Sequence, residues 1–142
     1  MKLLFLDFDG VLHPNFCETT DHFLLADALA SVLLAASKPP AVVISSSWRF
    51  HHAFDDLVSY LPDALGALVI GATPEVEPAR HQRYREIQAY LRSVRGPRDW
   101  RALDDERIGF PEKCPELIFC NGKRGVDRDA LALLGRWLAQ TA

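Results

Sequence analysis

Short apolar segments alternate with longer helical patterns along the chain, and this alternation restricts the possible folds more than any other feature. The apolar segments are residues 2–6, 41–44, 67–70, 100–103 and 117–120. Strands that are apolar on both faces are typical of parallel sheets covered by helices, and strands that alternate with helices form right-handed βαβ units. The pattern therefore predicts an α/β fold with a doubly wound, mostly parallel five-stranded sheet, helices on both faces and the first strand at the centre.

The segments between these strands predict the helices. Periodic apolar positions indicate helices over residues 21–37, 50–61, 80–94 and 127–140. Proline or glycine ends the first three of them, at Pro39, Pro62 and Gly96-Pro97. Residues 104–116 have no strong helical period. We find no internal repeat and no linker, so we expect one domain over residues 1–142.

Composition excludes several classes of protein. The chain has 142 residues, of which 49% are hydrophobic and 25% charged, as in ordinary globular domains. Its net charge of -3 disfavours a generally basic nucleic-acid-binding protein. The three cysteines form no C-x-x-C pair, which favours a reducing compartment. No stretch approaches the ~18 apolar residues of a membrane span, and the N-terminal apolar run is too short for a signal peptide, so we expect a cytoplasmic protein away from membranes.

Acidic and hydroxyl side chains follow three of the predicted strands. Asp7 and Asp9 follow the first strand, Ser45 follows the second, and Asp104 and Asp105 follow the fourth. Ligands of parallel sheets bind outside the carboxyl ends of the strands. Each of these residues alone could belong to an ordinary turn, but acids gathered at one sheet edge repel each other and need a cation. Hard oxygen ligands in this number favour Mg²⁺, bound together with substrate phosphate.

These motifs resemble those of the haloacid dehalogenase (HAD) superfamily, in the same order along the chain. Residues 5–12 (FLDFDGVL) resemble its first motif, and residues 42–45 (VVIS) resemble the second. Arg83 matches the third, a cation near a helix N-terminus, and residues 102–105 (ALDD) resemble the fourth. The segment SSSWR at residues 45–49 also resembles the HAD domain of Swiss Army Knife RNA repair proteins.

The resemblance implies an Mg²⁺-dependent phosphatase that acts through an aspartyl-phosphate. Asp7 would be the nucleophile, and Asp9 would be the general acid and then the general base. Ser45 would bind a phosphoryl oxygen. Arg83 would offset its negative charge.

The same resemblance implies a ligand set for Mg²⁺. Asp7, the main-chain carbonyl of Asp9 and Asp105 would hold the ion, with Asp104 as the alternative to Asp105. Arg80 competes with Arg83 for the cationic role, because both lie near the apolar face of the predicted helix. Arg83 fits the family spacing better.

The substrate is less well defined by the sequence. Candidate contacts beside the motifs are Phe8, Ser46, Trp48 and Arg49. The segments after the first and third strands leave no room for a cap domain, and capless relatives often act on large substrates or borrow a cover from a partner. Residues 80–98 contain six arginines and one acid, Glu86. This basic strip could steer RNA or DNA ends to the site, although a solvated charged surface explains it equally well.

Other polar residues have simpler interpretations. His13 could reach the site, but we interpret it as a loop residue, and we expect His51 and His52 at the solvated surface. We expect Cys120 to be buried and residues 121–125 (NGKRG) to form a solvated turn. The oligomeric state stays open.

Two other functions are compatible with a doubly wound sheet. A signalling receiver domain carries its phosphate-accepting Asp after the third strand, but this chain has Gly71-Ala72-Thr73 there. A non-catalytic or signalling phospho-binding domain is the other alternative. The intact set of Asp7, Asp9, Ser45 and Asp105 argues against loss of the chemistry.

Overall fold

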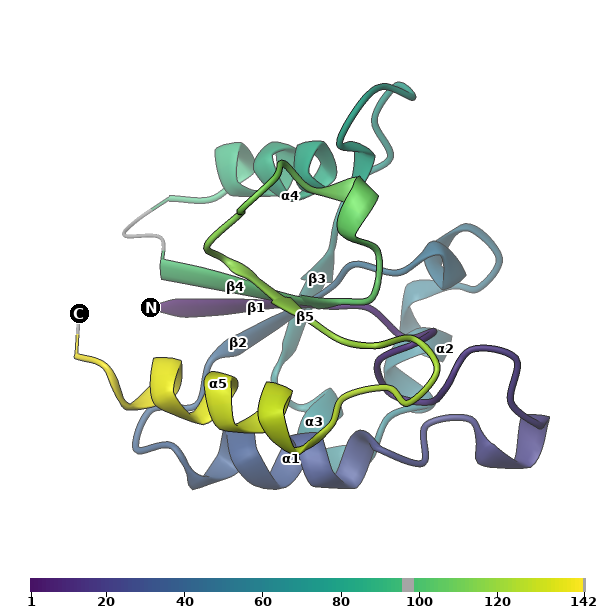
Figure 1. The fold of residues 1–142 in the computed structure, drawn as a ribbon, viewed down its shortest axis with the longest axis vertical. Helices are drawn as coiled ribbons and strands as arrows, with labels where there is room; N and C mark the ends of the chain where they lie inside the picture. The colour runs from purple at the N-terminus through teal and green to yellow at the C-terminus, as the bar shows by residue number, and fades with distance from the viewer. Residues whose placement is uncertain (96–98, 142) are drawn as a thin grey trace.

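A parallel sheet forms the centre of the protein (Figure 1). The computed structural model describes residues 1–95 and 99–141. Within them the five strands are all parallel and have the order β3-β2-β1-β4-β5. Their bounds are β1 Lys2–Leu6, β2 Ala41–Ile44, β3 Val69–Ala72, β4 Asp99–Asp104 and β5 Leu117–Phe119. The predicted α/β fold and the central position of the first strand are confirmed.

Helices cover both faces of this sheet (Figure 1). Helix α4 packs on one face, and α1, α3 and α5 lie on the other. The α-helices are α1 Ala26–Ala35, α2 Phe54–Ser59, α3 Asp63–Gly66, α4 Gln82–Ser93 and α5 Arg128–Ala139. The described residues also include three 3₁₀ turns, which follow β1, β2 and β4: η1 Thr19–Asp21, η2 Ser47–Phe50 and η3 Arg107–Gly109. No cap domain is inserted among the described residues between β1 and β2 or between β3 and β4.

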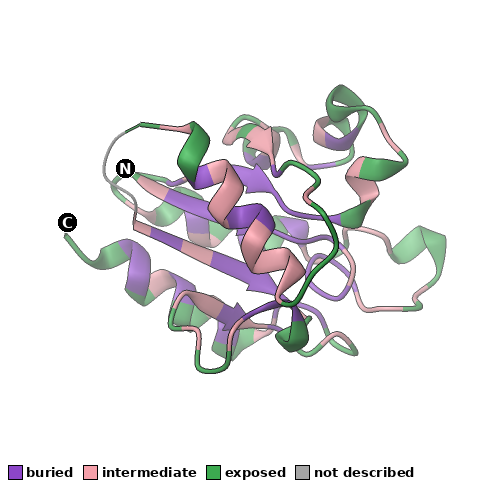
Figure 2. Cartoon of the chain, turned by 90° about the horizontal axis from the view of Figure 1, so that it is seen from above, coloured by how far each residue is buried: buried purple, intermediate pink, exposed green. Residues whose placement is uncertain are grey.

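The residues of strand β1 are mostly buried (Figure 2). They alternate between two cores, one on each face of the sheet. Leu4 and Leu6 belong to the core under α1 and α5. Leu3 and Phe5 belong to the core under α4. This two-sided burial explains why the strand is a continuous apolar run.

Two predicted helices differ from those in the structure. The first begins at Ala26 instead of residue 21. Phe23 has a positive φ of 65° and donates its N–H to the His13 ring, which is incompatible with a right-handed helix at that residue. The second, predicted over residues 50–61, is shortened to α2, Phe54–Ser59, and Phe50 belongs to the preceding turn η2. Pro62 is the N-cap of the additional short helix α3.

Smaller differences concern the ends of elements. Strand β3 lies two residues later than residues 67–70, because α3 extends to Gly66. Helix α4 begins at Gln82 instead of residue 80. The predicted stop at Gly96-Pro97 lies outside the described residues.

The register of the sheet aligns the ends of neighbouring strands. Main-chain N–H groups just beyond four strands, β1, β2, β3 and β5, donate to carbonyl oxygens at or near the end of the adjacent strand, which extends the hydrogen-bond ladder past the regular sheet. The bonds are Thr73 to Ile44, Ser45 to Leu6, Asp7 to Leu103 and Cys120 to Asp104. The residues that follow β1, β2 and β4 therefore share one edge of the sheet.

Among the helices of the described residues, none combines the length and apolar character that crossing a membrane requires.

Replacement of a buried leucine in α1 should separate core packing from helix propensity. Leu33 is fully buried, whereas its neighbour Leu34 is 46% exposed. We expect Leu33→Ala to lower the free energy of unfolding by about 2–5 kcal/mol, because it leaves a cavity between α1 and the sheet. The matched variant Leu34→Ala should change it by less than about 0.5 kcal/mol. Urea unfolding followed by circular dichroism measures both, and similar losses in the two variants would contradict the assigned core.

Candidate active site

Three carboxylates converge at the carboxyl edge of the sheet. Asp7 follows β1, Asp104 ends β4 and Asp105 comes next. One oxygen of each side chain lies within 4.8 Å of the others. Asp7 and Asp104 are buried, and Asp105 is half-buried. The predicted convergence of these acids is confirmed by the register of β1 and β4.

Main-chain and side-chain donors orient each carboxylate. Phe8 N donates to Asp7 Oδ1 at 2.8 Å, and Glu106 N donates to Asp104 Oδ1 at 3.0 Å. Asn15 Nδ2 donates to Asp105 Oδ2 at 2.8 Å. The Asn15 contact was not foreseen, because 90 residues separate the pair in sequence and no local pattern marks it.

Two glycines make room for the Asp105 carboxylate. Gly10 has a positive φ of 76°, and a Cβ placed on it would collide with Asp105. A Cβ on Gly122 would lie 2.6 Å from Asp105 Oδ2. Residues 121–125 do form a turn, as predicted, but this turn closes on the site instead of lying free in solvent.

Arg83, in the first turns of α4, binds the acids. Its Nε lies 3.0 Å from Asp104 Oδ2, and its Nη2 lies 3.9 Å from Asp7 Oδ1. Its Nη1 donates to the carbonyl oxygen of Ser45 at 2.7 Å. Arg80 is exposed and precedes α4, since His81 at φ 59° interrupts the helix. The structure therefore brings Arg83 to the acids and leaves Arg80 outside.

Burial dominates the electrostatics of this group. It raises the pKa of Asp7 well above its usual range, and the charge of Asp104 raises it further. Burial also raises the pKa of Asp104 to about 7, although Arg83 lowers it. Burial alone would lower the pKa of Arg83, but the neighbouring acids, with Asp104 and Asp7 first among them, together raise that pKa. The site thus contains more acidic side chains than its one bound guanidinium can neutralise.

Ser45 presents an unused hydroxyl to the same edge. The residue is 1% exposed, and its Oγ has no hydrogen-bond partner among the residues that the structure describes. A buried hydroxyl without a partner is costly. This orphaned donor, beside Arg83, marks a position where an anionic oxygen would be bound.

Asp9 is separate from the three carboxylates and is held by two aromatic side chains. His13 Nε2 lies 2.7 Å from Asp9 Oδ1, and Trp48 Nε1 donates to Asp9 Oδ2 at 3.0 Å. Phe23 N donates to His13 Nδ1 at 3.1 Å, so the hydrogen of a neutral His13 ring is assigned to Nε2. Both oxygens of Asp9 therefore accept a hydrogen bond from a fixed ring.

Comparison with known proteins agrees with this arrangement. The model of the family described as the HAD domain in Swiss Army Knife RNA repair proteins matches residues 3–131. The chain belongs to this family. No curated protein and no solved structure matches it. The family assignment supports a hydrolase of the phosphatase type and suggests a nucleic-acid substrate.

The interpretation of His13 as a plain loop residue was wrong for this HAD domain. Its side chain is 1% exposed and is bonded to Asp9 and Phe23. The spacing of four residues between Asp9 and His13 was the available signal, but it is informative only once the chain reverses at Gly10. The structure shows that reversal as a hydrogen bond from Gly10 N to the carbonyl oxygen of His13.

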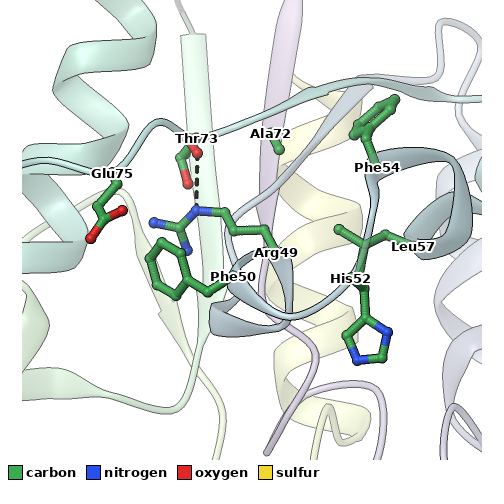
Figure 3. Close-up of a pocket in the computed structure, with 8 residues that line it drawn as sticks. All are labelled: Arg49, Phe50, His52, Phe54, Leu57, Ala72, Thr73 and Glu75. Atoms are coloured by element: carbon green, nitrogen blue, oxygen red, sulfur yellow. Dashed lines mark hydrogen bonds between the residues drawn. The ribbon is translucent and has the colours of Figure 1, made fainter.

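The candidate substrate-binding residues of the HAD domain lie beside the site, and several of their polar groups already form hydrogen bonds within the protein. Phe8 is fully buried, and Ser46 Oγ accepts a hydrogen bond from Trp48 N. Arg49 Nη2 binds Glu86 Oε2 at 2.6 Å, and Arg49 also donates to the carbonyl oxygen of Thr73 (Figure 3). Their contact with substrate stays a prediction.

The arginines of the predicted basic strip do not share one role. Arg83 faces the acids, and Arg85 Nη1 donates to the carbonyl oxygen of Glu77. Arg92 and Arg95 are exposed. Arg98 lies outside the described residues.

A group of rings continues outward from His13 and Trp48, and we call it the ring cluster. Its members are Phe8, His13, His22, Phe23, Trp48, His52 and Tyr60. His52 was expected at the solvated surface together with His51. Only His51 fits that expectation, since His52 stacks on Trp48 with ring centroids 5.2 Å apart.

The raised pKa values predict how the stability of the metal-free protein depends on pH. The pKa of Asp104 lies above its ordinary value of 3.8, and that of Asp7 is also raised, so folding favours their protonated forms. The stabilising contribution of Asp104 is present below about pH 4 and is lost as the pH rises through about 7. Asp7 contributes in the same direction, since its pKa is also raised. We expect Asp104→Asn to show a smaller fall in melting temperature than the wild type over this range, measured by thermal unfolding in EDTA. The exposed control Asp129→Asn should follow the wild type, and an Asp104→Asn curve parallel to both would contradict the assignment.

Proposed function

We propose that this HAD domain, spanning residues 1–142, is an Mg²⁺-dependent phosphatase that hydrolyses phosphoric monoesters through an aspartyl-phosphate on Asp7. The observation that carries the proposal is the convergence of three carboxylates within 4.8 Å beside the unpartnered Ser45 hydroxyl. The acids fit a cation, and the hydroxyl fits a phosphoryl oxygen. A site with both features suits a dianionic phosphate better than a neutral ligand.

The carboxylates fit Mg²⁺ by their chemistry and their surplus of negative charge. Mg²⁺ prefers oxygen ligands and is usually held by one or two carboxylates together with substrate phosphate. Asp7, Asp105 and the main-chain carbonyl of Asp9 would hold it. Asp104 suits a supporting role, because Arg83 and Glu106 N already bind its two oxygens. A bound Mg²⁺ would neutralise the acids and polarise the phosphoryl group.

In the first step Asp7 attacks the phosphorus atom of the substrate. A bond forms between an oxygen of Asp7 and phosphorus as the ester bond breaks, and protonated Asp9 gives its proton to the leaving oxygen. Ser45 Oγ donates a hydrogen bond to one phosphoryl oxygen. Arg83, fixed by Asp104, offsets negative charge on the transferring group.

In the second step water attacks the phosphorus of the aspartyl-phosphate. Asp9, now ionised, takes a proton from that water, and the bond between phosphorus and Asp7 breaks to release phosphate. His13 and Trp48 hold one lone pair on each oxygen of Asp9, which leaves others for the transferred proton. Their rings therefore orient Asp9 and leave its remaining lone pairs free to accept a proton.

The substrate we propose is a phosphorylated end of RNA or DNA. The family description names RNA repair, and the described residues include no cap domain over the sheet edge, so a large substrate has access. All three cysteines are free, which fits a reducing compartment such as the cytoplasm.

Asp7→Asn should abolish turnover and preserve the fold. An amide is a poor nucleophile and a weaker cation ligand, and the change removes one buried acid from a crowded group. We expect activity on an aryl phosphate with Mg²⁺ to fall to background, while the melting temperature in EDTA stays equal or rises. Asp129→Asn, an exposed change outside the site, should retain activity. Full activity in Asp7→Asn would reject the covalent mechanism.

Asp9→Asn should separate the two steps. Hydrolysis of an alkyl phosphate, whose leaving oxygen needs a proton, should fall by about 10²–10⁴-fold. The rate of the first step with an activated aryl phosphate should fall less, because its leaving oxygen needs little protonation. Hydrolysis of the aspartyl-phosphate should still be slow, because the variant has no general base for the attacking water. Phosphorylated Asp7 should therefore accumulate and be visible by mass spectrometry in the presence of Mg²⁺. Equal losses on both substrates with no trapped adduct would show that Asp9 is not the acid–base group.

A further inference from the structure

The ring cluster contacts Asp9, which in the proposed mechanism donates a proton to the leaving oxygen. His13 and Trp48 each donate an N–H to one oxygen of Asp9. Whatever part of the substrate is attached to the leaving oxygen must emerge past Asp9. It therefore meets the ring cluster as the first surface outside the catalytic site.

Two histidines form the outer layer of this cluster. His22 stacks on His13 with centroids 4.6 Å apart and planes at 24°. His52 stacks on Trp48 with centroids 5.2 Å apart and planes at 20°. Each histidine is half-buried, so part of its surface remains accessible to solvent. Among the described residues, the other rings near them make edge or tilted contacts and do not stack on a second face.

His52 is fixed in this position and borders open space. Its Nδ1 lies 3.0 Å from the hydroxyl oxygen of Tyr60, whose ring meets it edge-on. It also lines a cavity of about 290 Å³ together with Phe50 and Phe54 (Figure 3). A planar group could therefore stack on the fixed ring of His52 and extend into the adjoining cavity.

We infer that His22 and His52 form a base-binding subsite for the nucleoside that carries the scissile phosphate. The inference rests on the proposed phosphatase function and names the part of the substrate that the site selects. Nucleobases splayed from a single strand stack on aromatic and histidine rings, in a manner that tolerates different base sequences. The subsite thus favours a nucleotide end over a sugar phosphate, which has no planar face to stack.

The position of the two histidines also favours a nucleotide over a phosphotyrosine. In a phosphotyrosine the ring is joined directly to the leaving oxygen, so it would lie against Asp9 itself. In a nucleotide the ribose separates the base from that oxygen. His22 and His52 lie one ring beyond the two groups that contact Asp9, which matches the longer spacing.

The test compares substrates that differ only in a base. The probes are 5′-phosphorylated and 3′-phosphorylated RNA tetranucleotides, each paired with a version whose phosphorylated terminal residue is abasic. The measured quantity is the ratio of kcat/KM for the intact and abasic members of a pair, with Mg²⁺. Because both members are assayed on the same preparation, differences in folded fraction cancel.

We expect the wild type to prefer the intact member of at least one pair by about tenfold, within the range found for single base-stacking contacts. His22→Ala and His52→Ala should each reduce this preference, and the double variant should bring the ratio close to one. His52→Phe, which keeps a ring, should retain it. His51→Ala is the matched control, since His51 is the exposed neighbour of His52 outside the ring cluster, and it should behave as the wild type.

Three outcomes would overturn the inference, and they are distinguishable. Equal efficiency on intact and abasic substrates by an active wild type would reject the base subsite and leave the phosphatase function standing. A stronger preference for a phosphotyrosyl peptide, lost in His52→Ala, would assign the rings to a different substrate. No hydrolysis of any phosphate ester, including the aryl phosphate, would reject the proposed function together with the subsite.

Discussion

The rest of the site depends on the interaction of two buried carboxylates with one largely buried guanidinium. Asp7 and Asp104 are brought together by the pairing of β1 with β4, and their mutual repulsion is only partly relieved by Arg83. Separating them would require breaking the centre of the sheet. The fold therefore holds an unfavourable charge arrangement in place, as sites that bind cations and phosphates do.

Helix α4 connects this charge group to the neighbouring strands. Arg83 binds the acids, and Glu86, less than one turn later, binds the buried guanidinium of Arg49. Arg49 in turn donates to carbonyl oxygens of Ser46 and Thr73, which follow β2 and β3. A single helix thus ties the ends of β2 and β3 to those of β1 and β4. This network accounts for the burial of Arg49, which from its sequence position could equally have faced substrate.

Asp9 is positioned by a different set of contacts from those that hold Asp7 and Asp104. The chain reverses at Gly10, and His13 returns to bind Asp9, while Trp48 reaches it from the end of β2. Asp7 is thereby kept in an acidic, dehydrated group, and Asp9 is kept half-exposed among aromatic rings. Two acids two residues apart acquire distinct surroundings, which fits the proposed roles of nucleophile and acid–base partner.

The sequence by itself determined the sheet, its central strand and the edge at which the acids meet. Segments such as Ala41–Ile44 pack in the cores on both faces of the sheet, and their consecutive apolar residues predict this burial. The acidic and hydroxyl residues that follow β1, β2 and β4 predict the edge of the sheet at which the site forms. Only the tertiary structure decided the partners of Asp9, the inward turn of Arg49, the contact of Asn15 with Asp105 and the late start of α1. These depend on side chains from distant segments and on positive φ values at Phe23 and His81, which local hydrophobic periodicity does not encode. Periodicity reports which face of an element is buried, whereas the choice among polar partners is made only when the elements have packed.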